Sequence, residues 1–350
     1  MHVIWGLLLA VFMALAGEYL AHVATPALGL QKGAISPIMM AILLGILVNN
    51  VFTLPEALRP GIKFSVVRIL RLGIVLLGIR LSIVEAGAIG LKSLPIIIGT
   101  VSAALLIVTF VSKRVGLTER LGTLVAVGTS ICGCTAIVAT APTIAAKDDE
   151  VSYAVACITL FGVVAMLAYP FAAHWLFEAD AFKSGLFLGT AVHETAQVAG
   201  AGLVYQEYFG DPEALNVATV TKLVRNLGML FVIPLMAVLY HRRSSEGTEA
   251  PAWYTMVPLF VIGFAAMSLL RTIGDMGDKP FGVLEPEQWK SIVGFIKQIA
   301  TYCLAIAMAA VGLGTSVKGL REIGLKPLGV GLFSALLVGF VSYVLISILY

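Results

Sequence analysis

Two titratable residues, His193 and Glu194, stand side by side inside a long apolar run of the sequence. A carboxylate near the middle of a membrane is costly unless it is paired or protonated, so it indicates a function by default. Imidazole titrates near neutral pH, and the two groups could together carry a proton. Gln197 lies one helical turn after His193, where we expect it to contact the substrate. With Glu194 it could instead ligate sodium. The structural alternative is a hydrogen-bonded pair that locks two helices together.

A second polar group follows in the next apolar run. Lys222, Arg225 and Asn226 are spaced three and four residues apart, so they share one face of a helix. Arginine offers a planar fork and lysine a point charge, so this face could balance Glu194 or bind an anion. Lys222 could also snorkel toward the outer surface, because it lies about two turns from that end of the helix. The pattern favours a functional role for Arg225 and leaves Lys222 open.

The stretch Gly128–Ala141 is the third candidate, because it is small, polar and interrupted by glycine inside an apolar run. Irregular backbone at membrane depth is tolerated only where protein or a water-filled cavity satisfies it. We expect the helix to unwind at Gly133 and a new half-helix to begin near Cys134, with free N–H groups that favour anions. A tightly packed helix crossing is the alternative. The residues expected to bind substrate here are Ser130, Cys132, Gly133, Cys134 and Thr135.

The composition fits only a helical membrane protein. Of 350 residues, 59% are hydrophobic and 12% are charged, and the mean hydropathy is +0.98. A soluble domain could not cover its surface with so few polar groups. The net charge of +3 gives no indication of nucleic-acid binding. The four cysteines lack the spacing of a zinc site or a disulfide framework, and nothing indicates a metal or another cofactor.

Apolar runs of about 20 residues predict eleven membrane segments, or ten if one of them does not span. They lie at 2–24, 34–53, 64–84, 90–112, 120–146, 151–172, 183–205, 215–240, 253–271, 291–316 and 327–349. The connections are short, so residues 1–350 are expected to form a single integral membrane unit without a soluble domain. A core region would include 120–146 and 183–240, and the remaining helices would form a scaffold.

The distribution of Lys and Arg predicts the orientation. If all eleven segments span, one face carries eleven of these residues and the other carries six, together with an acidic loop at 207–213. The more basic face is the cytoplasmic one. We therefore expect a multi-pass protein with its N-terminus in the cytoplasm and its C-terminus outside.

Two internal similarities point to inverted repeats. Gly78–Leu94 aligns without gaps to Gly312–Leu328, and seven of the 17 positions are identical. In the predicted topology the two copies face opposite sides, which is typical of alternating-access transporters. A weaker similarity links Gly128–Ala141 to Gly189–Ala199, the stretch that contains His193 and Glu194. The two discontinuous helices are expected to cross near the membrane midplane.

Three stretches of the sequence, GTSICGCTAI, AVHETAQVAGAG and the following KLVRN, resemble the sulfate exporter (YeiH-type) family of bacterial inner-membrane proteins. The resemblance covers most of the chain, including RLGIVLLGIRLS and the tail GLGTSVKGLREIGLKPL. That family is grouped with the cation:proton antiporter and anion transporter superfamily. The resemblance implies a bacterial inner-membrane transporter with a core domain of crossing broken helices beside a scaffold, with the breaks at Ser130–Thr135 and Val192–Gln197. Cys134 departs from the small Ala or Ser expected of a typical member.

The expected function is secondary active transport of a small anion, such as sulfate, a sulfonate or a carboxylate, coupled to a proton or to sodium. The expected partners are the anion, the coupling ion and membrane lipid, with a homodimer as one assembly. The protein is not expected to be an enzyme. Two alternatives are a passive anion channel and an intramembrane hydrolase that pairs Cys132 or Cys134 with His193, although no hydrolase motif is present.

Overall fold

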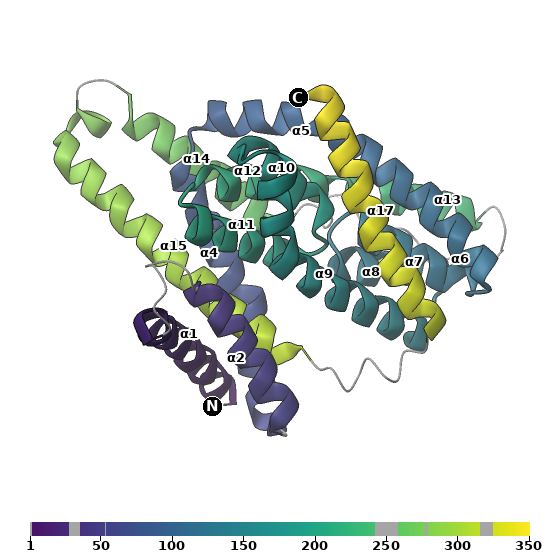
Figure 1. The fold of residues 1–350 in the computed structure, drawn as a ribbon. Coiled ribbons are helices and arrows are strands. Elements are labelled where there is room, and N and C mark those ends of the chain that lie inside the picture. Colours follow the sequence, from purple (N-terminus) through teal and green to yellow (C-terminus); the bar gives the residue numbers. More distant parts are fainter. Residues whose placement is uncertain (1, 28–35, 53, 242–257, 277–278, 316–324) are drawn as a thin grey trace. The chain divides into compact units, whose positions relative to one another are not determined.

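The structure is a computed structural model that describes residues 2–27, 36–52, 54–241, 258–276, 279–315 and 325–350. In these residues every regular element is a helix, and none is a strand (Figure 1). The prediction of an all-α membrane protein is therefore confirmed. The chain divides into two compact units, and the division falls inside helices α5, α11 and α12.

Unit 1 consists of Met1–Leu91, Gly202–Asn216 and Pro258–Ser316. Helix α15 packs on α1, α2 and α4, and α14 packs on α4. The approach of α2 to α15 depends on small residues, because a Cβ added at Gly45 would lie 2.7 Å from the carbonyl oxygen of Ala309. The helices of this unit are α1 (His2–Ala27), α2 (Pro37–Val51), α3 (Arg59–Phe64), α4 (Leu70–Leu77), α14 (Leu259–Gly274) and α15 (Pro286–Gly314), with the start of α5 (Ile83–Ala103), the end of α11 (Thr195–Phe209) and the start of α12 (Glu213–Leu227).

Unit 2 consists of Lys92–Ala201, Val217–Val257 and Val317–Tyr350. Helix α17, yellow in Figure 1, packs on α7, α9 and α10, while α8 packs on α7, α9 and α13. The buried core of the unit is aliphatic and centres on α7 and α8. Its remaining helices are α6 (Thr109–Val115), α7 (Glu119–Ser130), α8 (Cys134–Thr140), α9 (Asp148–Leu176), α10 (Ala181–Ala191), α13 (Met229–His241) and α17 (Leu325–Leu349).

The number of membrane crossings is not settled by helix length. Within the described residues, six helices are long and apolar enough to span: Val3–Thr25, Ile83–Val115, Asp148–Leu176, Glu213–Tyr240, Pro286–Gly314 and Leu325–Leu349. Two of the predicted segments, 120–146 and 183–205, are each divided into two shorter helices. The count of eleven, the orientation of the termini and the division into core and scaffold remain predictions.

The longer internal repeat can be followed in its first copy only. Gly78–Arg80 forms a 3-10 turn that leads into α5. In the second copy, residues 316–324 lie outside the described residues. The two broken helices of the weaker repeat both lie in unit 2 and are fully described.

Candidate functional site

The first break, residues 131–133, interrupts the helix predicted at 120–146. Helix α7 begins at the N-cap Thr118, whose hydroxyl accepts the N–H of Leu121 at 3.2 Å. It ends at Ile131, and α8 begins after Gly133, which has φ +68° and ψ −126°. Residues other than glycine rarely adopt a positive φ of this kind. The predicted unwinding at Gly133 is confirmed.

The second break, residues 192–194, has a different backbone. Helix α10 ends at Ala191, and Val192 is extended with φ −83° and ψ 140°, a conformation open to any residue. Helix α11 then begins at Thr195. The Gln197 side chain reaches back to accept the N–H of Glu194 at 3.1 Å, which is half of a capping box. The break predicted within Val192–Gln197 is confirmed.

Helix α12 presents Lys222 to both breaks. The ammonium group donates hydrogen bonds to the carbonyl oxygens of Ile131 at 2.8 Å, Val192 at 3.2 Å and His193. Lys222 is fully buried, with 0% of its surface exposed. All three of its protons therefore have acceptors inside the unit, and the snorkelling interpretation does not describe this side chain.

Arg225 makes a parallel set of contacts one turn further along α12. Its Nε donates to the carbonyl of Ser130 at 2.7 Å, Nη2 donates to Thr129, and Nη1 donates to Thr190 and to Val192 at 3.2 Å. A further Nη1 contact of 3.5 Å reaches the carbonyl of Gly189. Arg225 is also 0% exposed. Among the described residues, one Nη2 proton is left without an acceptor.

These contacts have a common physical reason. The last carbonyls of a helix lack intrahelical partners and carry partial negative charge, so cations stabilise a helix C-terminus. Here two half-helices, α7 and α10, end inside one unit, and Lys222 and Arg225 donate hydrogen bonds to carbonyls at both ends. The sequence indicated that these cations share a helix face, but it did not indicate that backbone carbonyls would engage them.

The carboxylate of Glu194 lies against the start of α8. Its Oε1 accepts hydrogen bonds from the Cys134 thiol at 2.9 Å and from the Thr159 hydroxyl at 2.9 Å. A Cβ added at Gly133 would collide with Cγ of Glu194, so the glycine also makes room for this side chain. The two breaks therefore meet at Gly133 and Glu194. Glu194 is half-buried.

Thr159, on α9, was not predicted as a site residue. Besides its bond to Glu194, its carbonyl accepts a hydrogen bond from the Gln197 amide at 3.1 Å. The Gln197 side chain fits there because Gly162, one helical turn along α9, has no Cβ to occupy the space. A threonine and a glycine in an apolar helix look like ordinary packing residues, so the sequence carried no signal for this partner.

Several buried polar atoms near the breaks have no hydrogen bond among the described residues. Apart from a loose approach to the backbone of Ala191, both nitrogens of His193 are unpaired, although the residue is 0% exposed. The amide of Asn226 donates to the Thr195 hydroxyl at 3.1 Å, but its oxygen has no donor. Buried polar groups are normally satisfied, so unpaired ones call for an explanation such as a ligand or an ordered water.

Three predicted binding residues contribute differently from the expectation. Thr135 is exposed, so its hydroxyl does not join the buried groups. The Cys132 thiol packs against the Met229 sulfur at 3.4 Å, and the Ser130 hydroxyl donates to Val127 in its own helix at 3.1 Å. Ser130 contributes to the site through its carbonyl instead.

The thiols and acidic groups near the breaks have the following partners among the described residues. The described residues contain no group of three or more His, Cys, Asp or Glu side chains that could hold a metal ion. The thiol of Cys134 bonds to Glu194 and approaches Thr159, whereas the described part of the chain shows no hydrogen bond between either thiol and His193. These contacts suit a binding site for a solute more than they suit a nucleophile and its base.

Comparison with known proteins identifies the family. The family described as Conserved hypothetical protein 698 matches residues 5–331. A UPF0324 membrane protein of Streptococcus agalactiae is 34% identical over 306 residues, covering 87% of each chain. The UPF0324 inner membrane protein YeiH of Salmonella typhimurium is 31% identical over 343 residues, covering 95% of this chain and 91% of its own. No solved structure matches. The resemblance to YeiH-type proteins is thereby confirmed, and the chain belongs to the Conserved hypothetical protein 698 family of UPF0324 multi-pass membrane proteins.

Proposed function

We propose that the protein is a secondary active transporter of a small anion that works by alternating access. The observation that carries this proposal is the meeting of two helix breaks around the buried side chains of Lys222 and Arg225. Broken helices with charged groups between them are a recurrent form of substrate and ion sites in transporters. Unsatisfied backbone in a membrane is costly, so a helix that only anchors a protein would be more stable without such a break.

Formal charge favours an anion as the substrate. Lys222 and Arg225 contribute two positive charges to the region of the breaks, and Glu194 contributes one negative charge. A bound monoanion would balance the remaining positive charge. The imidazole of His193, which has no hydrogen bond among the described residues, is a donor that such an anion could use. Sulfonates and carboxylates are such monoanions, whereas sulfate, a dianion, would be balanced by the two cations when Glu194 is protonated.

Glu194 is the residue best placed to couple transport to a proton. Its carboxylate lies at the same junction as the proposed anion, so the two negative charges oppose each other. Protonation of Glu194, with His193 beside it, would remove this repulsion and favour anion binding. The anion and the proton would then move together. Sodium at Glu194 and Gln197 is the competing assignment, but the Gln197 oxygen already accepts the Glu194 N–H.

The remaining expectations belong to the same proposal. A bacterial inner membrane is the proposed location, consistent with the name of the Salmonella relative. The N-terminus would lie in the cytoplasm and the C-terminus in the periplasm. The protein would be a transporter and not an enzyme, with membrane lipid as its surroundings. No role in nucleic-acid binding is proposed, and a homodimer is one assembly to test.

A thermal-shift titration tests the proposal. A ligand that binds only the folded state raises its stability in proportion to the logarithm of ligand concentration above Kd. Purified protein is titrated with sulfate, sulfite, a sulfonate and a small carboxylate between pH 5 and pH 8, with potassium as the cation throughout. We expect at least one anion to raise Tm, and to do so at lower concentration as the pH falls. If no anion of these classes shifts Tm at any pH, the anion assignment is wrong.

A further inference from the structure

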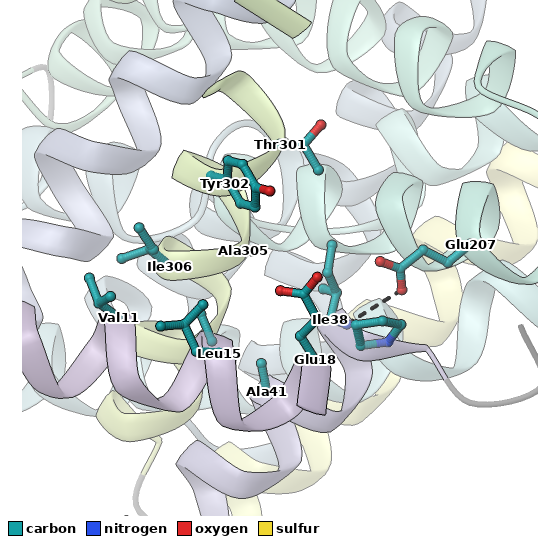
Figure 2. Close-up of a pocket in the computed structure, with 12 residues that line it drawn as sticks. Val11, Leu15, Glu18, Ile38, Ala41, Glu207, Thr301, Tyr302, Ala305 and Ile306 are labelled. Atoms are coloured by element: carbon teal, nitrogen blue, oxygen red, sulfur yellow. Dashed lines mark hydrogen bonds between the residues drawn. The ribbon is translucent and has the colours of Figure 1, made fainter. Parts of the chain in front are cut away.

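Unit 1 contains a cavity of about 310 Å³ that the proposed transport site does not use. It is bordered by α1, α2, α11 and α15, and Figure 2 shows its lining residues. Aliphatic side chains such as Val11, Leu15 and Ile306 make most of the wall. Small-molecule sites begin at about 300 Å³ and are mostly apolar with a few placed polar groups. Since a water molecule takes about 30 Å³ in the liquid, the cavity has room for roughly ten heavy atoms.

Two carboxylates face this cavity. Glu18 projects from α1, inside the apolar segment Val3–Thr25, and Glu207 projects from α11. Figure 2 shows both side chains directed toward the start of α2. One oxygen of Glu207, Oε2, accepts the hydroxyl of Ser36 and the N–H of Ile38 at 3.4 Å. The other oxygen of Glu207 has no hydrogen bond among the described residues.

In the described part of the chain, neither Glu18 nor Glu207 has an ion pair. The guanidinium of Arg80, in the same unit, bonds to Gln206 at 2.9 Å and to Thr301 at 3.4 Å and not to either glutamate. Glu18 is exposed and Glu207 is half-buried, and a carboxylate within an apolar membrane segment is unfavourable without a counter-charge. The wall therefore has apolar surface and negative charge together, which is what an amphipathic cation requires.

We propose that this cavity binds an organic amine, with an ammonium head and an apolar body of roughly ten heavy atoms. The ammonium protons would be shared between Glu18 and the free oxygen of Glu207, and the body would contact Val11, Leu15 and Ile306. A neutral molecule of the same shape would leave both carboxylates without a counter-charge. A carboxylic acid would add a third negative charge. The site selects for cations, whereas the helix breaks of unit 2 are proposed to select for anions.

Benzylamine and benzyl alcohol test the proposal, because they share size and shape and differ in charge at pH 7. Each is titrated into the purified protein while Tm is followed. We expect benzylamine to raise Tm with a saturable dependence and benzyl alcohol to leave it unchanged at the same concentrations. Equal effects of the two probes would overturn the proposal, because they would show an apolar pocket without selection for charge. No effect of either probe would overturn it as well.

Substitutions locate the effect. Glu18→Gln and Glu207→Gln keep the shape of each side chain and remove its charge, so each should weaken the response to benzylamine on the order of tenfold. Glu287→Gln is the matched control, because Glu287 lies exposed in the first turn of α15, outside the cavity. Ala305→Phe fills the cavity without touching either carboxylate and should abolish the response. An unchanged response in Ala305→Phe would place the amine elsewhere and overturn the proposal, even if a glutamate variant failed to fold.

Discussion

The two helix breaks of unit 2 perform the same task with different backbones. The first break depends on Gly133, because other residues adopt its φ of +68° only at a cost in conformational energy. The second break passes through Val192 in an ordinary extended conformation and contains no glycine. Because its backbone accepts any side chain, the second break can carry His193 and Glu194. The conformation of the first break therefore requires glycine, whereas the second break can carry the titratable groups.

The breaks also share their cations. Lys222 donates to carbonyls of both breaks, and Arg225 does the same from the next turn of α12. Neither half-helix end is therefore satisfied independently of the other. Changes to the cations should disturb both breaks, while changes within one break should be more local. The following predictions separate these cases, from the largest effect to the smallest.

Arg225→Met should have the largest effect on stability. It leaves the carbonyls of Thr129, Ser130 and Thr190 without their side-chain donor in a buried region, and each such loss costs about 1–3 kcal/mol, while Val192 keeps its bond from Lys222. We expect a loss of about 5 kcal/mol, measured as reduced thermal stability and reduced yield of monodisperse protein in detergent. Lys113→Met, at an exposed position of the same unit, is the control and should behave as the wild type. A fully stable Arg225→Met protein would contradict the shared-cation description.

Arg225→Lys sharpens the same point. It preserves the positive charge, but an ammonium group donates from one nitrogen, whereas the guanidinium of Arg225 spreads its hydrogen bonds over Nε, Nη1 and Nη2. We expect a loss of about 3 kcal/mol, intermediate between the wild type and Arg225→Met. Thermal unfolding of the three proteins in one detergent measures the order. If Arg225→Lys equals the wild type, charge alone is sufficient and the geometry is unimportant.

Gly133→Ala tests whether the first break really depends on conformation. An alanine at this φ is strained by about 1–3 kcal/mol, and its Cβ would displace the Glu194 side chain. Gly329→Ala is the control, because Gly329 lies in α17 with no atom within 4 Å of an added Cβ. That substitution should be neutral or stabilising by up to about 1 kcal/mol. Equal stabilities of the two variants would remove the distinction between the breaks.

Glu194→Gln should have the smallest effect on stability, below about 1 kcal/mol, since an amide oxygen can still accept from Cys134 and Thr159. Its effect should appear in binding: the anion-dependent rise in Tm should lose its pH dependence. Glu178→Gln, at an exposed position of unit 2, provides the matched control and should retain it. Persistent pH dependence in the Glu194 variant would assign the proton to another group.

Part of this site was predictable from sequence because it has a local signature. The glycine in an otherwise apolar helix predicted the first break, and the resemblance to YeiH-type proteins implied the second, within Val192–Gln197. The first prediction depends on residue type and the second on the resemblance, and both breaks are confirmed by the backbone. The three residues of the predicted face of α12, Lys222, Arg225 and Asn226, are all buried.

What the sequence did not predict depends on contacts between distant segments. Backbone carbonyls exist at every residue, so nothing in the sequence marked Ile131 and Val192 as acceptors for Lys222. Thr159 is one of many small residues in apolar helices and became significant only through its bond to Glu194. Hydropathy also cannot distinguish a spanning helix from two half-helices, which is why the number of crossings remains a prediction.

Anion flux in proteoliposomes with an imposed pH gradient tests directly whether the protein couples anion transport to a proton. Wild type and Glu194→Gln are reconstituted at equal density, and uptake of the anion that gives the largest thermal shift is followed with and without the gradient. We predict saturable wild-type uptake that an acidic exterior accelerates, and uptake by the Glu194→Gln protein that the gradient does not change. Non-saturable uptake that ignores the gradient in both proteins would contradict the account and favour a passive channel.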